Sequence, residues 1–242
     1  MCTVTYIPAR DRVFLTSNRD EKKRRLPALP PALYPFTSGH LLFPKDTEAG
    51  GTWIAAHENG QAIVLLNGGF VKHIPEPPYR KSRGLVLLDL VDSANAYTRF
   101  QSIALQNIEP FTAIIFIEGH LYECRWDGRQ KHMKQLSATE PHIWSSVTLY
   151  DAKVIAKRNN WFVQWLQQNP DPMGEAILHF HQFTGDGDSH NDLRMNRNGL
   201  MLTVSVTQMV VTEDSTHMQY LDLINNRPYT QHLVLEKTMA GR

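Results

Sequence analysis

Strand-like segments gather towards both ends of this chain, and the longest helix-like segments lie between them. Near the start, residues 3–7, 12–16, 52–56 and 61–66 are rich in β-branched and aromatic side chains. The later strand-like segments cover residues 111–117, 121–126, 199–211 and 217–223, the last being the final strand expected. Helical spacing of apolar residues marks 82–91, 151–166 and 172–180. This order favours an α+β sandwich over a doubly wound parallel sheet.

Residues 22–50 interrupt the strand pattern with the run KKRR and five prolines, Pro27, Pro30, Pro31, Pro35 and Pro44. Proline donates no backbone hydrogen bond and is typical of loops and strand edges. We expect this segment to be a long surface excursion with little regular structure.

The length of 242 residues suits one domain spanning residues 1–242. The net charge of +1 argues against a strongly basic nucleic-acid binder. The sequence contains neither an apolar run long enough to cross a bilayer nor a signal-peptide pattern at its start. With two cysteines and no disulfide framework, a cytoplasmic protein that acts on a small molecule is the simplest expectation.

Cys2 is the foremost candidate nucleophile. Removal of Met1 would leave a residue that carries both a thiol and a free α-amine. The amine has a reference pKa of about 8, so it can take the thiol proton near neutral pH. The alternative interpretation is that Cys2 is an incidental small apolar residue. Cys124 lies in an apolar strand pattern and is expected to be a buried thiol.

The segment Ser17-Asn18-Arg19-Asp20-Glu21 is expected to end the second strand. Side chains alternate between the two faces of a strand, so Asn18 and Asp20 share one face and Arg19 takes the other. If this strand pairs with residues 3–7, Asp20 can hold the α-ammonium of residue 2, and Asn18 can donate to an oxyanion. The alternative is a polar turn with a local ion pair.

Several blocks of this sequence resemble the NRDE family, also called the transport and Golgi organisation protein 2 family. These blocks are MCTVTY, SNRDE, GGTWIAA, LLNGGF, YRKSRG, PFTAIIF and WSSVTLYD, in that order. The resemblance implies a four-layer αββα sandwich of two antiparallel sheets, as in N-terminal-nucleophile hydrolases. The chain is also distantly similar to cysteine acylases of the penicillin V acylase and bile salt hydrolase group.

The resemblance to the acylases implies residue roles one position at a time. Their nucleophile falls on Cys2, the aspartate that holds its amine on Asp20, and the oxyanion asparagine on Asn67. Ser17 stands where the acylases carry an arginine, and Arg19 is the nearest substitute. Ser146 stands where they carry a later asparagine that touches the nucleophile.

Three further residues are candidates for substrate binding. Trp53, in Gly-Gly-Thr-Trp, is a candidate pocket wall, and Gly68 can present a backbone N–H beside Asn67. Arg83 belongs to a basic segment at the start of a helix, which suits an anionic group.

Two functions remain open from the sequence. The first is a cysteine-dependent hydrolase or acyl transferase that acts on an amide or related acyl bond without a cofactor or metal. The alternative is a non-catalytic protein that binds haem or a lipid in the same cleft, a role that the family resemblance implies loosely.

Overall fold

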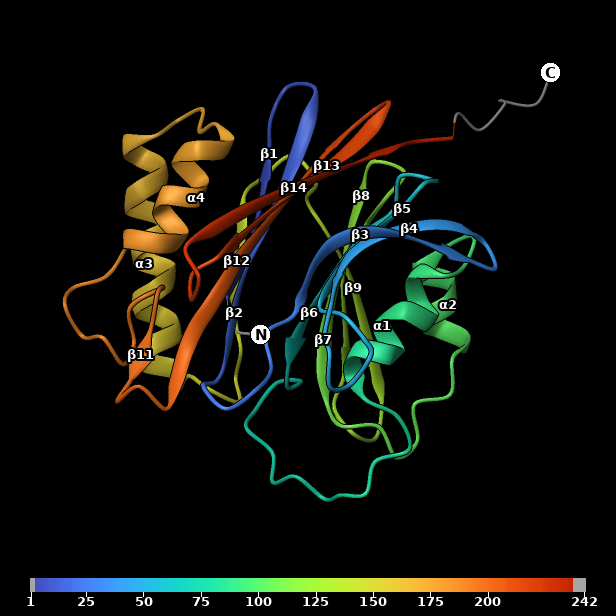
Figure 1. The fold of residues 1–242 in the computed structure, drawn as a ribbon, viewed down its shortest axis with the longest axis horizontal. Helices are drawn as coiled ribbons and strands as arrows, with labels where there is room; N and C mark the ends of the chain where they lie inside the picture. Colours follow the sequence, from blue (N-terminus) through green and yellow to red (C-terminus); the bar gives the residue numbers. More distant parts are fainter. Residues whose placement is uncertain (1–2, 237–242) are drawn as a thin grey trace.

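The computed structural model describes residues 3–236, which form two stacked sheets with a pair of helices outside each (Figure 1). Every pairing between neighbouring strands is antiparallel. The architecture is therefore the α+β, four-layer αββα sandwich that the sequence predicted.

The first sheet contains β1 (Thr3–Pro8) and β2 (Arg12–Lys22) together with the last strands of the chain. Its order is β10-β1-β2-β12-β13-β14, with the short β11 paired to β12. The partners are β10 (His142–Ser145), β11 (Asn196–Arg197), β12 (Met201–Thr212), β13 (Ser215–Asp222) and β14 (Arg227–Val234). The start of β1 consequently lies between β2 and β10.

The second sheet takes its strands from the middle of the chain, in sequence order from β3 to β9. They are β3 (Leu29–Phe36), β4 (Gly39–Lys45), β5 (Ile54–His57), β6 (Ala62–Asn67), β7 (Phe111–Ile117), β8 (His120–Trp126) and β9 (Lys131–Leu136). Each strand thus lies beside its neighbour in the sequence, as in a meander.

The helices lie in two pairs, on opposite sides of the sandwich (Figure 1). The pair α1 (Arg83–Val91) and α2 (Ala96–Ser102) packs on the second sheet through Leu87, Leu90 and Phe100. On the first sheet lie α3 (Ala152–Gln168) and α4 (Gly174–Phe183). Ser82 caps α1 and Asp151 caps α3, at the positions where the sequence predicted these helices to begin, and each accepts a hydrogen bond from a first-turn backbone N–H.

Alternation along the strands divides the core into layers. Val4 and Tyr6 of β1 face the second sheet, where they join Ile54 and Val64 in the core between the sheets. Their neighbours Thr3 and Thr5 are also fully buried, but they hydrogen-bond to α3 and α4. A strand buried on both faces in this way is held in a fixed register.

Two expectations from the sequence were wrong. Residues 22–50 are not an irregular excursion, because β3 and β4 form a hairpin within them. The prolines of β3 fit because this strand is the edge of its sheet. Proline has no backbone N–H to donate, and an edge strand has a side on which no neighbouring strand needs that hydrogen bond. In addition, β13 is not the final strand, since β14 follows it and pairs with it.

Candidate functional site

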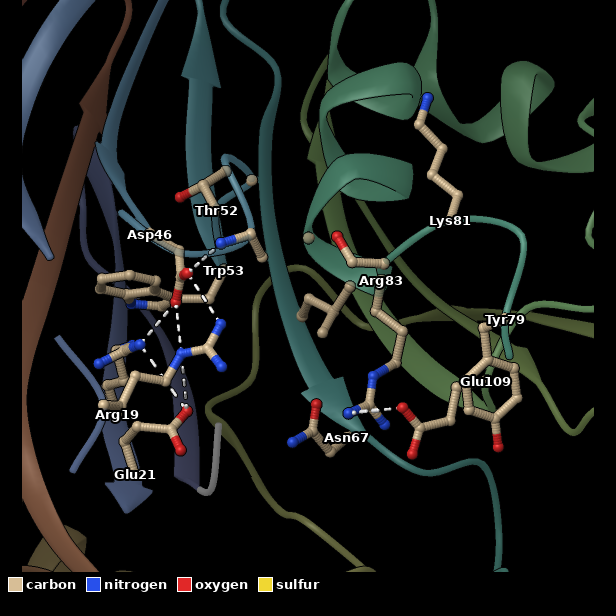
Figure 2. A pocket seen from close by; sticks show the side chains of 16 residues that line it. Arg19, Glu21, Asp46, Thr52, Trp53, Asn67, Tyr79, Lys81, Arg83 and Glu109 are labelled. Atoms are coloured by element: carbon tan, nitrogen blue, oxygen red, sulfur yellow. Dashed lines mark hydrogen bonds and ion pairs between the residues drawn. The ribbon is translucent and has the colours of Figure 1, made fainter. Parts of the chain in front are cut away.

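A cavity of about 400 Å³ opens at the end of the sandwich where β2 and β6 end and α1 begins. Figure 2 shows that its side chains come from two opposing walls. Arg19 of β2 and Asp46, the residue after β4, lie on one wall, and Arg83 and Glu109 lie on the other. Arg25, three residues after β2, joins the first wall through its ion pair with Asp46. Asn67, at the end of β6, lies between the walls.

The first wall is an ion-pair network centred on Asp46. Its carboxylate accepts hydrogen bonds from Arg19 Nη2 at 2.7 Å and from Arg25 Nη2 at 2.8 Å. Burial raises the pKa of Asp46, but the Arg25 hydrogen bond, the Ala49 backbone N–H and both guanidinium charges outweigh it, and the net pKa is lowered. Asp46 is therefore ionised at neutral pH and holds both arginines in place.

Trp53 lines this cavity, and its ring packs against the side chain of Arg19. The Arg19 guanidinium carbon is 4.8 Å from the centre of the indole ring, which is a cation–π contact. Trp53 is 3 % exposed and also packs in the core between the sheets. The ring consequently ties the orientation of Arg19 to the core.

The second wall contains an ion pair between Arg83 and Glu109, which has fewer charged partners than the network around Asp46. Arg83 Nη2 lies 3.0 Å from Glu109 Oε2, and the other oxygen of Glu109 contacts His73 Nε2 at 3.0 Å. Burial lowers the pKa of Arg83, against the raising effect of Glu109. The guanidinium is thus held in a desolvated position with one carboxylate directly beside it.

A close backbone contact fixes the distance between the two walls. A Cβ atom at Gly51 would lie 2.4 Å from the carbonyl carbon of Gly84, and one at Gly84 would lie 2.8 Å from Thr52 O. The Thr52 N–H also donates to Gly84 O at 3.3 Å. Glycine at both positions therefore lets the segment before β5 lie directly against the start of α1.

Asn67 also lines a second cavity, of about 220 Å³, on the side of β10 and α3. It is the residue that the two linings share. Ser146 lies in this second lining, and its hydroxyl donates to Asn67 O at 2.9 Å. The structure thus brings two sequence candidates, Asn67 and Ser146, into direct contact.

Gly68 lies in the same lining with φ +90°. A side chain there would meet Val147 and Thr148, so glycine is required by both its dihedral angle and its surroundings. The backbone N–H of Gly68 donates to Pro110 O at 3.0 Å. This N–H therefore has a partner within the protein, contrary to its expected role as an oxyanion donor.

The alternation expected along β2 is present, but the larger cavity lies on the Arg19 face. Asn18 faces the outer helices, and its amide donates to His181 O at 3.0 Å and Leu193 O at 2.8 Å. Because both amide N–H groups are used in these bonds, the expectation that Asn18 donates to an oxyanion was wrong.

Asp20 is buried on the same side of β2 as Asn18. Its carboxylate accepts hydrogen bonds from Tyr150 Oη at 2.7 Å and from Thr203 Oγ1 at 2.5 Å. The register between β2 and β12 shifts here, with Thr203 opposite Asp20 and Ser205 opposite Arg19. This β-bulge is a local change in twist beside the candidate site.

A buried arginine connects this region to the start of β1. Arg158 of α3 is fully buried, donates to Thr3 Oγ1 at 2.5 Å, and lies 3.6 Å above the Tyr150 ring. Its other nitrogens donate to the carbonyl groups of Asn191 and Asp192. Arg158 thus joins the first described residue of the chain to the tyrosine that binds Asp20.

Cys2 itself lies outside the described residues. Its neighbour Thr3 is opposite Asn18 on β2 and opposite Ser145 on β10. The residues that follow these two partners are Arg19 and Ser146, which line the two cavities.

Cys124, the other cysteine, is fully buried as expected, and burial raises its pKa to about 12.

Sequence reasoning missed several charged residues of the larger cavity, namely Glu21, Arg25, Asp46 and Glu109. Glu21 and Arg25 lie close together in the sequence, but Asp46 and Glu109 lie in separate segments, and no spacing in the sequence links them to the first two. Within residues 3–236, no group of three or more His, Cys, Asp or Glu side chains is arranged to hold a metal ion. Across the same residues, no helix is both long and apolar enough to span a membrane.

Solved structures with the same fold include two hydrolases of low sequence identity. One is the Caenorhabditis elegans ortholog of N-acylethanolamine-hydrolyzing acid amidase, with a TM-score of 0.58, 11% identity, and coverage of 86% of this chain and 92% of that chain. Another is a mutant of conjugated bile acid hydrolase from Clostridium perfringens, with a TM-score of 0.60, 10% identity, and coverage of 98% and 97%. These similarities establish the N-terminal-nucleophile hydrolase fold.

A second variant of the Clostridium perfringens hydrolase has a TM-score of 0.60 at 11% identity, over 99% of this chain and 100% of that chain. No curated protein matches the sequence closely enough to count as a relative. A family model described as Transport and Golgi organisation 2 matches residues 1–224.

Proposed function

The chain belongs to the Transport and Golgi organisation 2 family, and from that premise and its hydrolase fold we propose that it is an N-terminal-nucleophile amide hydrolase. The substrate is a small molecule with an amide or related acyl bond, and the nucleophile is Cys2. If an amine or alcohol replaces water in the second half of the reaction, the same site works as an acyl transferase. A cytoplasmic location is part of the proposal.

The reaction proceeds in two steps. The α-amine of Cys2 takes the thiol proton, and the sulfur attacks the acyl carbon to form a tetrahedral oxyanion beside the Asn67 amide. The ammonium then returns the proton to the leaving amine as the carbon–nitrogen bond breaks, leaving a thioester. Water, deprotonated by the same amine, attacks the thioester and releases the carboxylic acid and the thiol.

The observation that carries this proposal is the position at which β1 begins. Thr3 lies between Asn18 and Ser145, and the residues next along these strands, Arg19 and Ser146, line the two cavities that share Asn67. The sequence neighbour of Thr3 is Cys2. Of the described residues, Asn67 is thus the amide best placed for the role of oxyanion donor.

Side chains that can position the reacting groups lie around the start of β1. We assign Asp20 to the orientation of the Cys2 amine, with Tyr150 and Thr203 fixing its carboxylate. Arg158 anchors Thr3 from the helix layer. Ser146 holds the backbone of Asn67, which is a different role from the direct contact that the acylase resemblance implied.

The lining of the larger cavity favours the hydrolase over the alternative of a haem or lipid binder. Ion pairs of Arg19, Asp46 and Arg83 lie along its walls. Placing an apolar ring system or acyl chain against these charges would remove water from them without compensation.

The test is covalent labelling of the protein after removal of Met1. A β-lactone probe, which acylates nucleophilic thiols, should increase the mass of the intact protein by that of one probe molecule. Peptide mapping should place this adduct on Cys2. Cys2→Ala should abolish the adduct, whereas Cys124→Ala should leave it unchanged, because Cys124 is buried and its pKa is raised to about 12. Asn67→Ala should slow labelling about 100-fold.

Labelling of Cys124 in place of Cys2, or equal labelling of wild type and Cys2→Ala, would overturn the proposal. Retention of Met1 in protein purified from its natural host would do the same. A saturable haem titration of unlabelled protein would instead support the binding alternative.

A further inference from the structure

We propose that the substrate carries a small carboxylate close to its scissile amide, and that Arg83 binds this carboxylate in the larger cavity. This inference rests on the proposed function for the amide bond. It adds the chemical class of the substrate, which the fold alone does not give.

The size of the cavity limits the substrate. Its volume of about 400 Å³ lies at the small end of the range for ligand pockets, and its apolar and aromatic side chains are those of Ala49, Trp53, Leu65 and Tyr79. Trp53 is itself covered by the Arg19 guanidinium. This leaves little continuous apolar surface for a long acyl chain.

The wall of Arg83 has the charge that an anion needs. Arg83 has Glu109 as its ion-pair partner and donates a long hydrogen bond, of 3.3 Å, from Nη1 to Pro110 O. Glu109 divides its two oxygens between Arg83 and His73. Burial lowers the pKa of Arg83, which means that its charge is poorly solvated. A second carboxylate would restore the hydrogen bonds that burial removes from this guanidinium.

Lys81 does not serve this purpose, although it belongs to the same lining. Its ammonium is bound to Asp89, at 2.7 Å from Oδ1 and 2.5 Å from Oδ2. Figure 2 shows the side chain extending away from Arg83 and Asn67. Lys81 is consequently a matched control, a cation of the same lining that we do not expect to touch the ligand.

Arg25 approaches from the other wall. It shares Asp46 with Arg19, and Glu21 and Glu48 lie 3.7 Å and 3.3 Å from its nitrogens. The acidic groups on this side exceed the two arginines. The charge of Arg25 is thus already matched by its own acidic partners. The surplus of acidic groups would repel a dianion such as a phosphate more strongly than a carboxylate, so the geometry favours a single carboxylate bound by Arg83.

The experiment measures binding rather than turnover, with Cys2→Ala protein so that no probe is consumed. Isothermal titration compares N-acetyl-β-alanine with its neutral carboxamide and with N-acetyl-1,3-diaminopropane, which is cationic. Glutaramate places the carboxylate on the acyl side instead and decides which half of the substrate carries it. We expect at least one of the two anions to bind at least tenfold more tightly than the neutral and cationic probes.

Three variants in the same background locate the site. Arg83→Gln should weaken binding of the preferred anion at least tenfold, because it removes the charged donor. Glu109→Gln should tighten binding several-fold, because it removes the competing carboxylate. Lys81→Gln should change the dissociation constant less than twofold. Damage to the fold would weaken binding in both cavity variants, so the opposite signs distinguish recognition from damage.

Equal binding of the anionic and neutral probes would overturn the inference, as would weaker binding in Glu109→Gln. If Arg83→Gln does not fold, the Glu109→Gln result decides. These measurements are independent of the labelling of Cys2. Anion binding without labelling would contradict the hydrolase alone, and labelling without selectivity for anions would contradict the substrate class alone.

Discussion

A fully buried histidine holds the outer face of the strands that lead to the candidate site. His181 of α4 contacts Thr5 Oγ1 through Nε2 at 2.8 Å and Asn18 Oδ1 through Nδ1. Burial, followed by the positive charge of Arg158, lowers the pKa of His181 to about 3. The imidazole is therefore neutral in the folded protein at neutral and mildly acidic pH.

This histidine predicts a loss of stability in mild acid. The pKa of His181 is about 3 in the folded state and about 6.5 in the unfolded state, so only the unfolded state gains a proton between these values. Its contribution is complete above pH 6.5 and is lost as the pH falls towards 3. Between pH 7 and pH 5, we expect the free energy of unfolding to decrease by about 1–2 kcal/mol through this group.

Urea unfolding of wild type and His181→Gln at both pH values measures the effect. Other groups contribute equally to both proteins, so the difference between their pH dependences isolates His181. The same dependence in both would contradict the prediction.

The sequence predicted the alternation of Asn18, Arg19 and Asp20 but not the face that meets the larger cavity. Both faces of β2 are buried, so its polarity pattern carries no information about which one faces the other sheet. The charged partners Asp46 and Glu109 come from distant segments, and only the pairing of the sheets brings them to Arg19 and Arg83.

At the scale of elements, most of the missed strands share one property. Besides β4 and the two-residue β11, they are β3, β9, β10 and β14, the four edges of the two sheets. Edge strands bury less apolar surface, and all four carry partly exposed or polar residues, so their hydrophobic pattern is weak. The central hairpins and the helices α1, α3 and α4 were predicted with their approximate bounds, whereas the short helix α2 was missed.

The contact between the segment before β5 and the start of α1 gives a prediction at this scale. Gly51→Ala should destabilise the protein by more than about 2 kcal/mol and alter ligand binding, because its Cβ would overlap the Gly84 backbone. Gly119→Ala is the control. That position has φ +74° but open space around it, so about 1 kcal/mol of strain is expected. Urea unfolding and titration with the preferred anionic probe measure both, and an equal effect at the two positions would contradict the argument.

At the scale of the whole molecule, the two sheets depend on each other. The first sheet is assembled from residues 3–22 and 142–234, and the second from residues 29–136. The core between them contains Val4 and Met209 from one sheet and Ile54 and Val64 from the other. Separation of the sheets would expose this shared core, so neither sheet has a complete core of its own.

This dependence predicts one cooperative unfolding transition, in agreement with a single domain over residues 1–242. Urea unfolding followed by far-ultraviolet circular dichroism, near-ultraviolet circular dichroism and hydrodynamic radius should give coincident curves. An early transition seen by one of these signals would indicate that a part of the sandwich unfolds separately.

The two cavities that share Asn67 both use β6, and the rest of each lining comes from different elements. The larger one uses β2, the residue after β4 and the start of α1, and the smaller one uses β10, α3 and β8. Away from β6, a substitution in one lining therefore does not replace a residue of the other. Under our proposal, selection can retune the acyl half and the amine half of a substrate separately, so related chains can diversify by exchanging one specificity at a time while the chemistry between them stays constant.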